Sequence, residues 1–256
     1  MTRIATLFAR KTKRILNVYC TAGYPQLDST LEVMQSLQDN GADLIELGMP
    51  YSDPLADGPV IQQSGLVALS NGMTIDVLFQ QLQGMRPKIT VPVILMGYMN
   101  PVLQYGFERF CSAAAAAGVD GLILPDLPEY EFDAEYGAVI RKYGLDFIFL
   151  VTPETSEARI RNLDERSTGF LYAVSSSSTT GSDKNMTDVT AYLQRLQELQ
   201  LKNPVLVGFG IKDKESFDRA SAHAAGAIIG TAYIKALEGA GTVQDKTKKF
   251  LGQVLA

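Results

Sequence analysis

Two acidic side chains near the start of this sequence are placed to do proton-transfer chemistry. Glu46 interrupts the apolar run at residues 44–47, and Asp57 follows in a proline-rich loop at residues 48–60. Proline restricts φ, so such a loop holds a carboxylate in place at a lower entropic cost. Two carboxylates above one pocket suit general acid–base catalysis, because different surroundings give them different pKa values. Each has a structural alternative: Glu46 as a paired buried acid, and Asp53 or Asp57 as a turn cap.

Glycine turns near the other end of the chain predict a site for a phosphate group. Gly208-Phe209-Gly210 follows one apolar run, and Gly230-Thr231 follows the next and opens a helical pattern. Glycine lets backbone N–H groups approach an anion, and the N-terminus of a helix carries a partial positive charge. These turns favour a small phosphorylated substrate.

Other catalytic groups are scarce. The single histidine, His223, lies in an alanine-rich helical pattern, where we expect a residue of the surface or of the bottom face and no general base. Cys20 and Cys111 are expected to be small buried apolar residues. The spacing of these residues matches no zinc site, so we expect no metal.

Eight short apolar runs, separated by amphipathic segments, must position these side chains. Such runs are typical of parallel strands that are buried on both faces. Their alternation with helices predicts a single (β/α)8 TIM barrel over residues 1–256, with an extra N-terminal helix at residues 3–13. An open doubly wound sheet is the alternative, but no G-x-G-x-x-G fingerprint follows the first run. The predicted strands are Leu16–Thr21, Leu44–Leu47, Val93–Gly97, Gly121–Leu124, Phe147–Val151, Phe170–Val174, Val205–Gly208 and Ala227–Ile229.

The barrel prediction places the acidic residues at one end of the molecule. Catalytic groups of such barrels lie in the loops that follow the strands. The two long loops, residues 48–60 and 175–187, therefore mark the expected mouth of the active site. Alternation along the second strand turns Glu46 away from Ile45 and Leu47, towards the barrel interior.

Charge and composition exclude several partners. The chain has 256 residues, of which 46% are hydrophobic and 20% charged, and a formal net charge of −5. Such an acidic surface attracts neither nucleic acid nor an anionic membrane. No apolar stretch reaches the roughly 20 residues that a membrane span needs, and no signal peptide is visible. We therefore expect a soluble, cytoplasmic protein.

One stretch of the sequence is similar to a known family signature. The residues E-L-G-M-P-Y-S-D-P-L-A-D-G-P at 46–59 resemble the motif of the tryptophan synthase α subunit family. The likeness continues through T-A-G-Y-P at 21–25, G-Y-M-N-P at 97–101 and P-D-L-P at 125–128. The resemblance implies retro-aldol cleavage of indole-3-glycerol phosphate into indole and glyceraldehyde 3-phosphate, a lyase step in tryptophan biosynthesis.

The resemblance also implies roles for individual residues. Glu46 is implied as the general acid–base that protonates indole C3 and assists deprotonation of the glycerol hydroxyl. Asp57 is implied as the group that accepts or stabilises the indole N–H proton. The implied phosphate-binding residues are Gly181, Gly210, Gly230 and Thr231. The implied indole pocket consists of Tyr19, Leu95, Tyr98 and Tyr172, with Thr21 near them.

The same resemblance implies a partner. Members of the family work with a β subunit in an α2β2 complex, and pyridoxal phosphate is expected on that subunit, with no cofactor in this chain. The loop at 175–187 departs from the family pattern, because Ser176 stands where many members have arginine, while Thr180-Gly181 is retained. Two alternatives stay open: a stand-alone lyase that releases free indole, and a non-catalytic chain that activates a β subunit.

Overall fold

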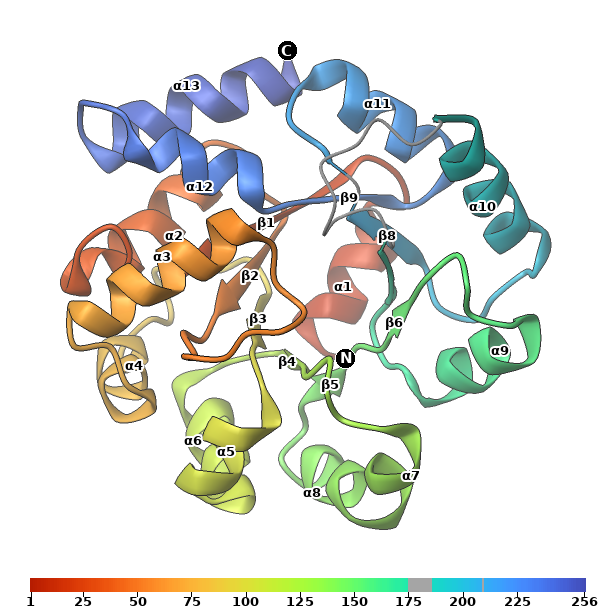
Figure 1. Cartoon of the computed structure of the whole chain (residues 1–256), viewed down its shortest axis with the longest axis horizontal. Helices are drawn as coiled ribbons and strands as arrows, with labels where there is room; N and C mark the ends of the chain where they lie inside the picture. The colour runs from red at the N-terminus through yellow and green to blue at the C-terminus, as the bar shows by residue number, and fades with distance from the viewer. Residues whose placement is uncertain (175–185, 209) are drawn as a thin grey trace.

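Short parallel strands form one sheet at the centre of the molecule (Figure 1). The computed structural model describes residues 1–174, 186–208 and 210–256. Within these residues the strand order is β5-β4-β3-β2-β1-β9-β8-β7-β6, and neighbouring strands are parallel. The strands are β1 (Ile15–Thr21), β2 (Leu44–Gly48), β3 (Val93–Met96), β4 (Gly121–Ile123), β5 (Asp146–Phe147), β6 (Leu150–Val151), β7 (Leu171–Val174), β8 (Val205–Gly208) and β9 (Gly226–Ile229).

The sheet closes into a barrel within the fifth predicted strand, which is divided into β5 and β6. β5 pairs with β4, and β6 pairs with β7. Between them, the Ile148 N–H donates to the Leu122 carbonyl at 3.1 Å, and the Tyr172 N–H donates to the Phe149 carbonyl at 3.0 Å. Taken together, β5 and β6 occupy one position, so the described sheet is the predicted eight-position barrel. The open doubly wound alternative is wrong, because the strands follow one another round the ring in chain order.

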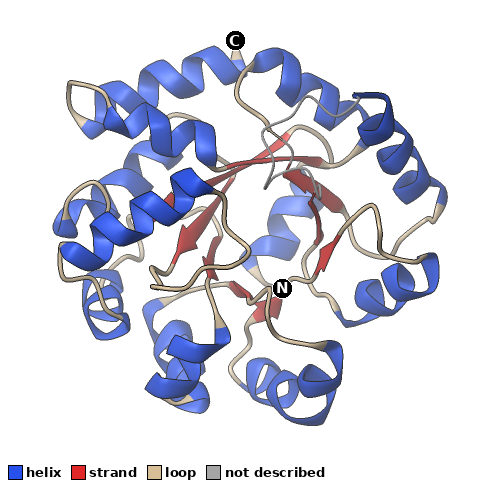
Figure 2. Cartoon of the chain, in the orientation of Figure 1, coloured by secondary structure: helices blue, strands red, loops and turns tan. Residues whose placement is uncertain are grey.

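Helices form the outer ring of the barrel (Figure 2). Two of the amphipathic segments between the strands form α2 (Thr30–Asp39) and α6 (Phe107–Ala117). The others are α1 (Arg3–Arg10), α3 (Pro59–Ser70), α4 (Ile75–Leu82), α5 (Met99–Tyr105), α7 (Glu129–Glu131), α8 (Gly137–Lys142), α9 (Glu157–Arg166), α10 (Met186–Glu198), α11 (Lys214–His223), α12 (Thr231–Glu238) and α13 (Val243–Leu255), with short η turns at Leu27–Ser29 and Phe132–Tyr136.

Two hydrophobic layers account for the nearly continuous apolar character of the strands. Side chains that point into the barrel, among them Ile15, Leu44 and Ile94, form an inner cluster. Their alternate neighbours, such as Leu16 and Ile45, pack outward against the helices. Both faces of each strand are therefore buried, as expected for a parallel barrel.

Helix α1 closes the end of the barrel at which the strands begin. Ile4 is fully buried in the inner cluster, and Leu7 and Phe8 pack against the same cluster. Figure 1 shows α1 within the outline of the ring. The expected N-terminal helix is therefore confirmed, although it ends at Arg10.

The joint between α6 and β4 shows how an acidic residue stabilises this closed end. Gly118 ends α6 in a left-handed conformation that favours glycine, and Asp120 follows it as a buried residue. The Asp120 carboxylate accepts hydrogen bonds from Arg3 at 2.9 Å, from Arg86 at 2.7 Å and from the Val93 N–H at 2.8 Å. This carboxylate is structural and lies at the opposite end of the barrel from the predicted active site.

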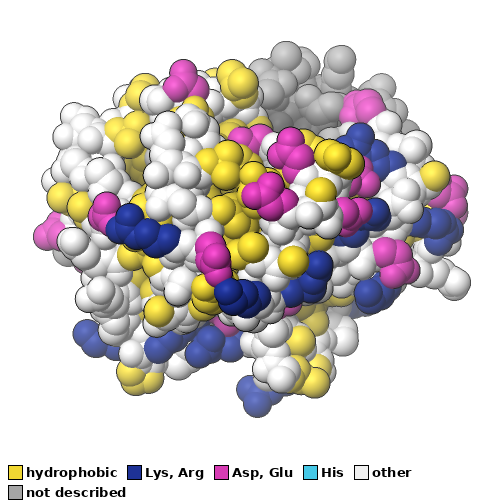
Figure 3. Space-filling view, turned by 90° about the horizontal axis from the view of Figure 1, so that it is seen from below, with side chains coloured by type: hydrophobic (Ala, Val, Ile, Leu, Met, Phe, Trp, Pro, Cys, Tyr) yellow, Lys and Arg dark blue, Asp and Glu magenta, His cyan; other side chains and the backbone are white. Residues whose placement is uncertain are grey.

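The molecular surface carries charges of both signs. In the view of Figure 3, Lys and Arg side chains lie at the lower edge and across the middle, and Asp and Glu side chains are interspersed with them and extend to the top. Ion pairs between neighbouring helices, such as Lys142 with Glu108 at 2.5 Å, join some of these groups. None of the helices in the described part of the chain is long and apolar enough to cross a membrane.

Candidate active site

A cavity of about 560 Å³ opens at the end of the barrel where the strands finish. Its volume is within the range of small-molecule sites, and its place is where barrels of this type carry their active sites. Loops after β2, β6, β8 and β9 contribute to its wall. The described residues that line it are Tyr19, Glu46, Ala56, Asp57, Gly58, Ile61, Met96, Pro125, Leu150, Thr152, Thr155, Arg159, Tyr172, Val174, Gly208, Gly210, Ile211, Ile228, Gly230 and Thr231.

Glu46 lies on the inner face of β2, at the floor of this cavity. The residue is 1% exposed, and its Oε2 accepts a hydrogen bond of 3.0 Å from Asn17 Nδ2 on the neighbouring strand β1. Burial raises the pKa of Glu46 to about 8; the hydrogen bond from Asn17 opposes the rise, and the negative charge of Asp57 adds to it. A carboxyl with this pKa is protonated at neutral pH and close to its titration midpoint, which suits a group that gives and takes a proton.

Asp57 reaches the same cavity from the loop after β2. Its N–H donates to the Pro54 carbonyl at 3.0 Å, and its own carbonyl accepts from Gln62 Nε2 at 2.8 Å, so both ends of the residue are held. Burial raises the pKa of the half-buried Asp57 to about 6, against a hydrogen bond from Tyr98 that lowers it. At neutral pH Asp57 is therefore ionised while Glu46 keeps its proton, which is the separation expected of an acid–base pair.

Tyrosine side chains shape the cavity beside the two carboxylates. Tyr19 and Tyr172 line it from β1 and β7. Gly48 makes room for the first ring and Gly208 for the second, because a Cβ added there would lie 2.0 Å from Tyr19 Oη and 2.5 Å from Tyr172 Cε2. Gly208, predicted to belong to a phosphate-binding turn, is thus needed for the packing of an aromatic ring.

Tyr98 supports the loop that carries Asp57 from the side. Its hydroxyl accepts a hydrogen bond of 3.0 Å from the Ala56 N–H, next to Asp57. Its ring lies 5.5 Å from that of Tyr51, centroid to centroid. Tyr98 therefore acts on the loop that carries Asp57, and it is absent from the described lining of the cavity.

Leu95 requires a correction. It is fully buried in the outer cluster, between the sheet and the helices, and not in the cavity. Met96, the next residue of β3, lines the cavity in its place. Consecutive side chains of a strand point to opposite faces, so a shift of one residue moves the contact from one layer to the other.

The predicted anion site lies at the far wall of the cavity. Gly230 caps α12, whose first residue, Thr231, is exposed, so the N-terminus of this helix opens onto the cavity. Gly210 also lines the wall, with a φ of +46°, and apart from its own atoms and those of its chain neighbours no described atom lies within 4 Å of the position that a Cβ would occupy there, so its backbone is accessible. The fourth predicted phosphate residue, Gly181, lies outside the described residues.

Comparison with known proteins decides the family. Residues 5–254 match the sequence profile of the family described as tryptophan synthase alpha chain. The chain belongs to the tryptophan synthase alpha chain family. It is 51% identical over 246 residues to the tryptophan synthase alpha chain of Flavobacterium johnsoniae, with 96% of each chain covered. It is 46% identical to that of Parabacteroides distasonis, with 98% of each chain covered.

Solved structures agree with this assignment. The alpha subunit of tryptophan synthase from Legionella pneumophila superposes with a TM-score of 0.90 at 35% identity, covering 99% of this chain and 97% of that one. As a member of this family, the protein is a lyase subunit of tryptophan biosynthesis.

Several lining residues of this tryptophan synthase alpha chain were missed in the sequence. Thr152, Thr155 and Arg159 line the cavity from the loop after β6 and the start of α9. The Arg159 guanidinium also forms an ion pair with Glu129 at 2.9 Å. The predicted strand end at Val151 was a usable signal, because polar residues directly after a barrel strand face the mouth. Asn17 was missed as well, although it interrupts an apolar strand as Glu46 does.

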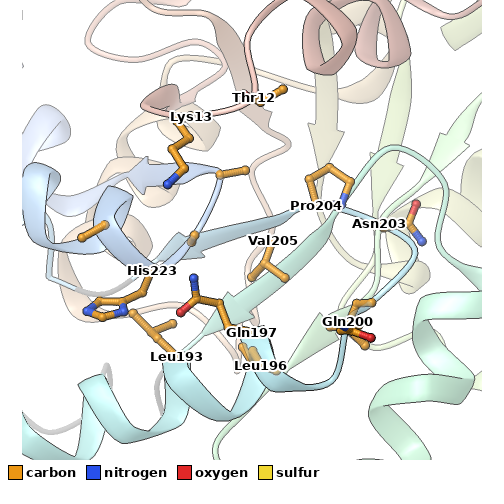
Figure 4. Close-up of a pocket in the computed structure, with 14 residues that line it drawn as sticks. Thr12, Lys13, Leu193, Leu196, Gln197, Gln200, Asn203, Pro204, Val205 and His223 are labelled. Atoms are coloured by element: carbon orange, nitrogen blue, oxygen red, sulfur yellow. The ribbon is translucent and has the colours of Figure 1, made fainter.

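A second pocket of the alpha chain, of about 270 Å³, lies at the other end of the barrel (Figure 4). Lys13 and His223 flank it, and Leu193 and Leu196 of α10 contribute apolar walls. It contains no pair of carboxylates among its described lining residues, and it lies where the strands begin. We therefore place the chemistry in the larger cavity and assign His223 no part in it.

Proposed function

We propose that Glu46 and Asp57 carry out the alpha reaction, the retro-aldol cleavage of indole-3-glycerol phosphate to indole and glyceraldehyde 3-phosphate. The observation that carries this assignment is the pair of carboxyls in one cavity with pKa values of about 8 and about 6. Near pH 7 the first is an acid and the second a base. The reaction needs both at its start.

The proton transfers balance over one turnover. The protonated Glu46 gives its proton to indole C3, and the Asp57 carboxylate stabilises or accepts the N–H proton of the resulting indolenine-like intermediate. The Glu46 carboxylate then takes the proton of the glycerol hydroxyl as the carbonyl of glyceraldehyde 3-phosphate forms. The electron pair of the broken C–C bond returns to the ring, Asp57 gives back any proton that it has accepted from the nitrogen, and indole is restored. Glu46 ends protonated, so no metal or cofactor enters the balance.

The substrate is proposed to span the cavity. Its phosphate lies at the N-terminus of α12, where Gly230, Thr231 and the accessible backbone of Gly210 line the cavity. Its indole ring lies against Tyr19 and Tyr172, close to Asp57. Thr231→Val should raise KM for indole-3-glycerol phosphate more than it lowers kcat, because it weakens binding of a group remote from the broken bond.

The partner is proposed to be a tryptophan synthase beta subunit in an α2β2 complex, with pyridoxal phosphate on the beta side. The loop after β2 supports a contact there, because the Leu55 side chain is 91% exposed next to the catalytic Asp57. An exposed leucine at an active-site mouth suits burial against another chain. Leu55→Ser should therefore reduce the stimulation of cleavage that a beta subunit gives, while the activity of the isolated chain stays as it is.

Glu46→Gln and Asp57→Asn test the catalytic assignment. Each should lower kcat by about 10²–10⁴-fold, the usual contribution of a positioned acid or base, with binding of indole-3-glycerol phosphate retained. Asp53→Asn is the matched control, since this exposed carboxylate of the same loop bonds to Ser52 at 2.5 Å. Near-normal cleavage by the Glu46 variant of the isolated chain would refute the proposal.

A further inference from the structure

Asn17 is a buried amide in a layer of the barrel that is otherwise apolar. It lies on the inner face of β1, two residues before Tyr19, and is 0% exposed. Its register partners on the neighbouring strands are Leu44 and Ile228, both members of the inner hydrophobic cluster. A polar side chain in such a layer is unfavourable unless it has a partner.

The amide has one partner and one free end. Its Nδ2 donates to Glu46 Oε2 at 3.0 Å, and both residues are buried. Its Oδ1 is buried and makes no hydrogen bond within the part of the chain that the structure describes. A buried acceptor without a donor is destabilising, and such groups call for a functional explanation. A leucine of similar shape would fill the same place without this loss.

The chemistry of Glu46 supplies the explanation. If Glu46 is the acid–base of the proposed reaction, it alternates between a carboxylic acid and a carboxylate in each turnover. A carboxylate needs a donor, whereas a carboxylic acid offers its own O–H. A primary amide has a donor at one end and an acceptor at the other. A half-turn of the Asn17 amide exchanges Nδ2 and Oδ1, and the unbonded Oδ1 shows that no other described group fixes one orientation.

We propose that Asn17 is a positioning residue for Glu46. Its Nδ2 donates to Glu46 when Glu46 is a carboxylate, and its Oδ1 accepts from Glu46 when Glu46 is a carboxylic acid. The inference rests on the proposed function for the exchange between the two forms. The contact between the two side chains stands on the geometry alone. A lysine in this place would hold only the ionised form, and an apolar residue would hold neither. The same hydrogen bond limits the rise of the Glu46 pKa that burial causes.

Asn17→Leu and Asn17→Asp test this inference in the full-length chain. The first removes both the donor and the acceptor, and the second keeps the shape but replaces the amide with an acid. A pH titration without substrate monitors the infrared carbonyl band of the protonated Glu46 carboxyl. The band is assigned by its loss in Glu46→Gln. The band's midpoint should rise by roughly one pH unit in Asn17→Leu, because the hydrogen bond lost from the charged carboxylate is stronger than the one lost from the neutral carboxylic acid.

Asn17→Asp should move the upper midpoint further, because two facing carboxyls share their protons and titrate as a pair. In both variants the high-pH limb of kcat/KM should move with the band. The value of kcat should fall by roughly ten- to a hundred-fold, and KM should change little, because misplacing a reacting group affects turnover most.

Thr247→Val is the matched control. Thr247 is a fully buried polar residue of α13 and is not among the described residues that line the cavity. Its hydroxyl lies 2.8 Å from the hydroxyl of Tyr233. It should destabilise the fold without moving the infrared midpoint or the high-pH limb. An equal movement in this variant would overturn the inference, as would unchanged midpoints in both Asn17 variants. If Asn17→Leu does not fold, Asn17→Asp decides. Near-normal cleavage by Glu46→Gln would reject the proposed function alone, because the infrared titration needs no substrate.

Discussion

Each end of the barrel contains a buried carboxyl group, and the two groups differ in their hydrogen-bond partners. Asp120, 6% exposed at the closed end, is bonded to two arginines and to the backbone N–H of Val93. Glu46, 1% exposed at the open end, is bonded to the neutral amide of Asn17. Burial is similar, but the partners differ in charge.

This difference separates a stabilising residue from the one that we propose transfers a proton. Cations and a backbone N–H replace the water that Asp120 loses, so its charge is held in place. A neutral amide compensates only in part for the burial of Glu46, and its pKa rises to about 8. The closed end gains stability from its carboxylate, while at the open end burial disfavours the charged form of Glu46, which therefore keeps a proton that it can transfer.

The largest expected effect on stability comes from removing the structural carboxylate of Asp120. Asp120→Ala leaves Arg86 in a largely buried position without its partner, so we expect a loss of about 3 kcal/mol in the free energy of unfolding. Urea titration measures it, and kcat of the folded variant should remain near that of the parent. Asp133→Ala is the control, because its ion pair with Arg166 is exposed and its removal should have a much smaller effect. A loss as small as that of the control would remove the contrast between the two ends.

The raised pKa of Glu46 should make the stability of the fold depend on pH. Between pH 6 and 8 the folded chain holds a proton on Glu46 that the unfolded chain, with the usual pKa of 4.5, has released. The free energy of unfolding should therefore fall as the pH rises, by at most about 1.4 kcal/mol per pH unit from this group. Urea titrations at several pH values should show the fall in the parent chain and a flatter profile in Glu46→Gln. Identical slopes would contradict the raised pKa.

The smallest effect is expected at the pocket that flanks the closed end. His223→Gln should change kcat/KM less than two-fold and the free energy of unfolding by less than about 0.5 kcal/mol, because His223 is only half-buried and lies far from the carboxylate pair along the barrel. Steady-state kinetics and urea titration measure both. A large loss of activity would mean that chemistry is not confined to the open end.

Alternation along a strand could be used only where one face carries a distinctive residue. In β2 the single acid between Ile45 and Leu47 shows which face is the interior, and the structure places Glu46 there. In β3 the run Val-Ile-Leu-Met is apolar on both faces, so the sequence holds no sign of which residues point inward. The resemblance implied Leu95, which lies in the outer layer, and alternation in this run could neither correct that assignment nor indicate Met96.

The sequence by itself determined the barrel, the order of its strands and the choice of Glu46 and Asp57 as candidate residues, because these depend on local periodicity and on a long motif. Only the tertiary structure decided how the acids behave. Asn17 and Glu46 are 29 residues apart and meet because β1 and β2 pair in a particular register. The pKa of Glu46 depends on water excluded by many segments of the chain, and no local pattern records that sum.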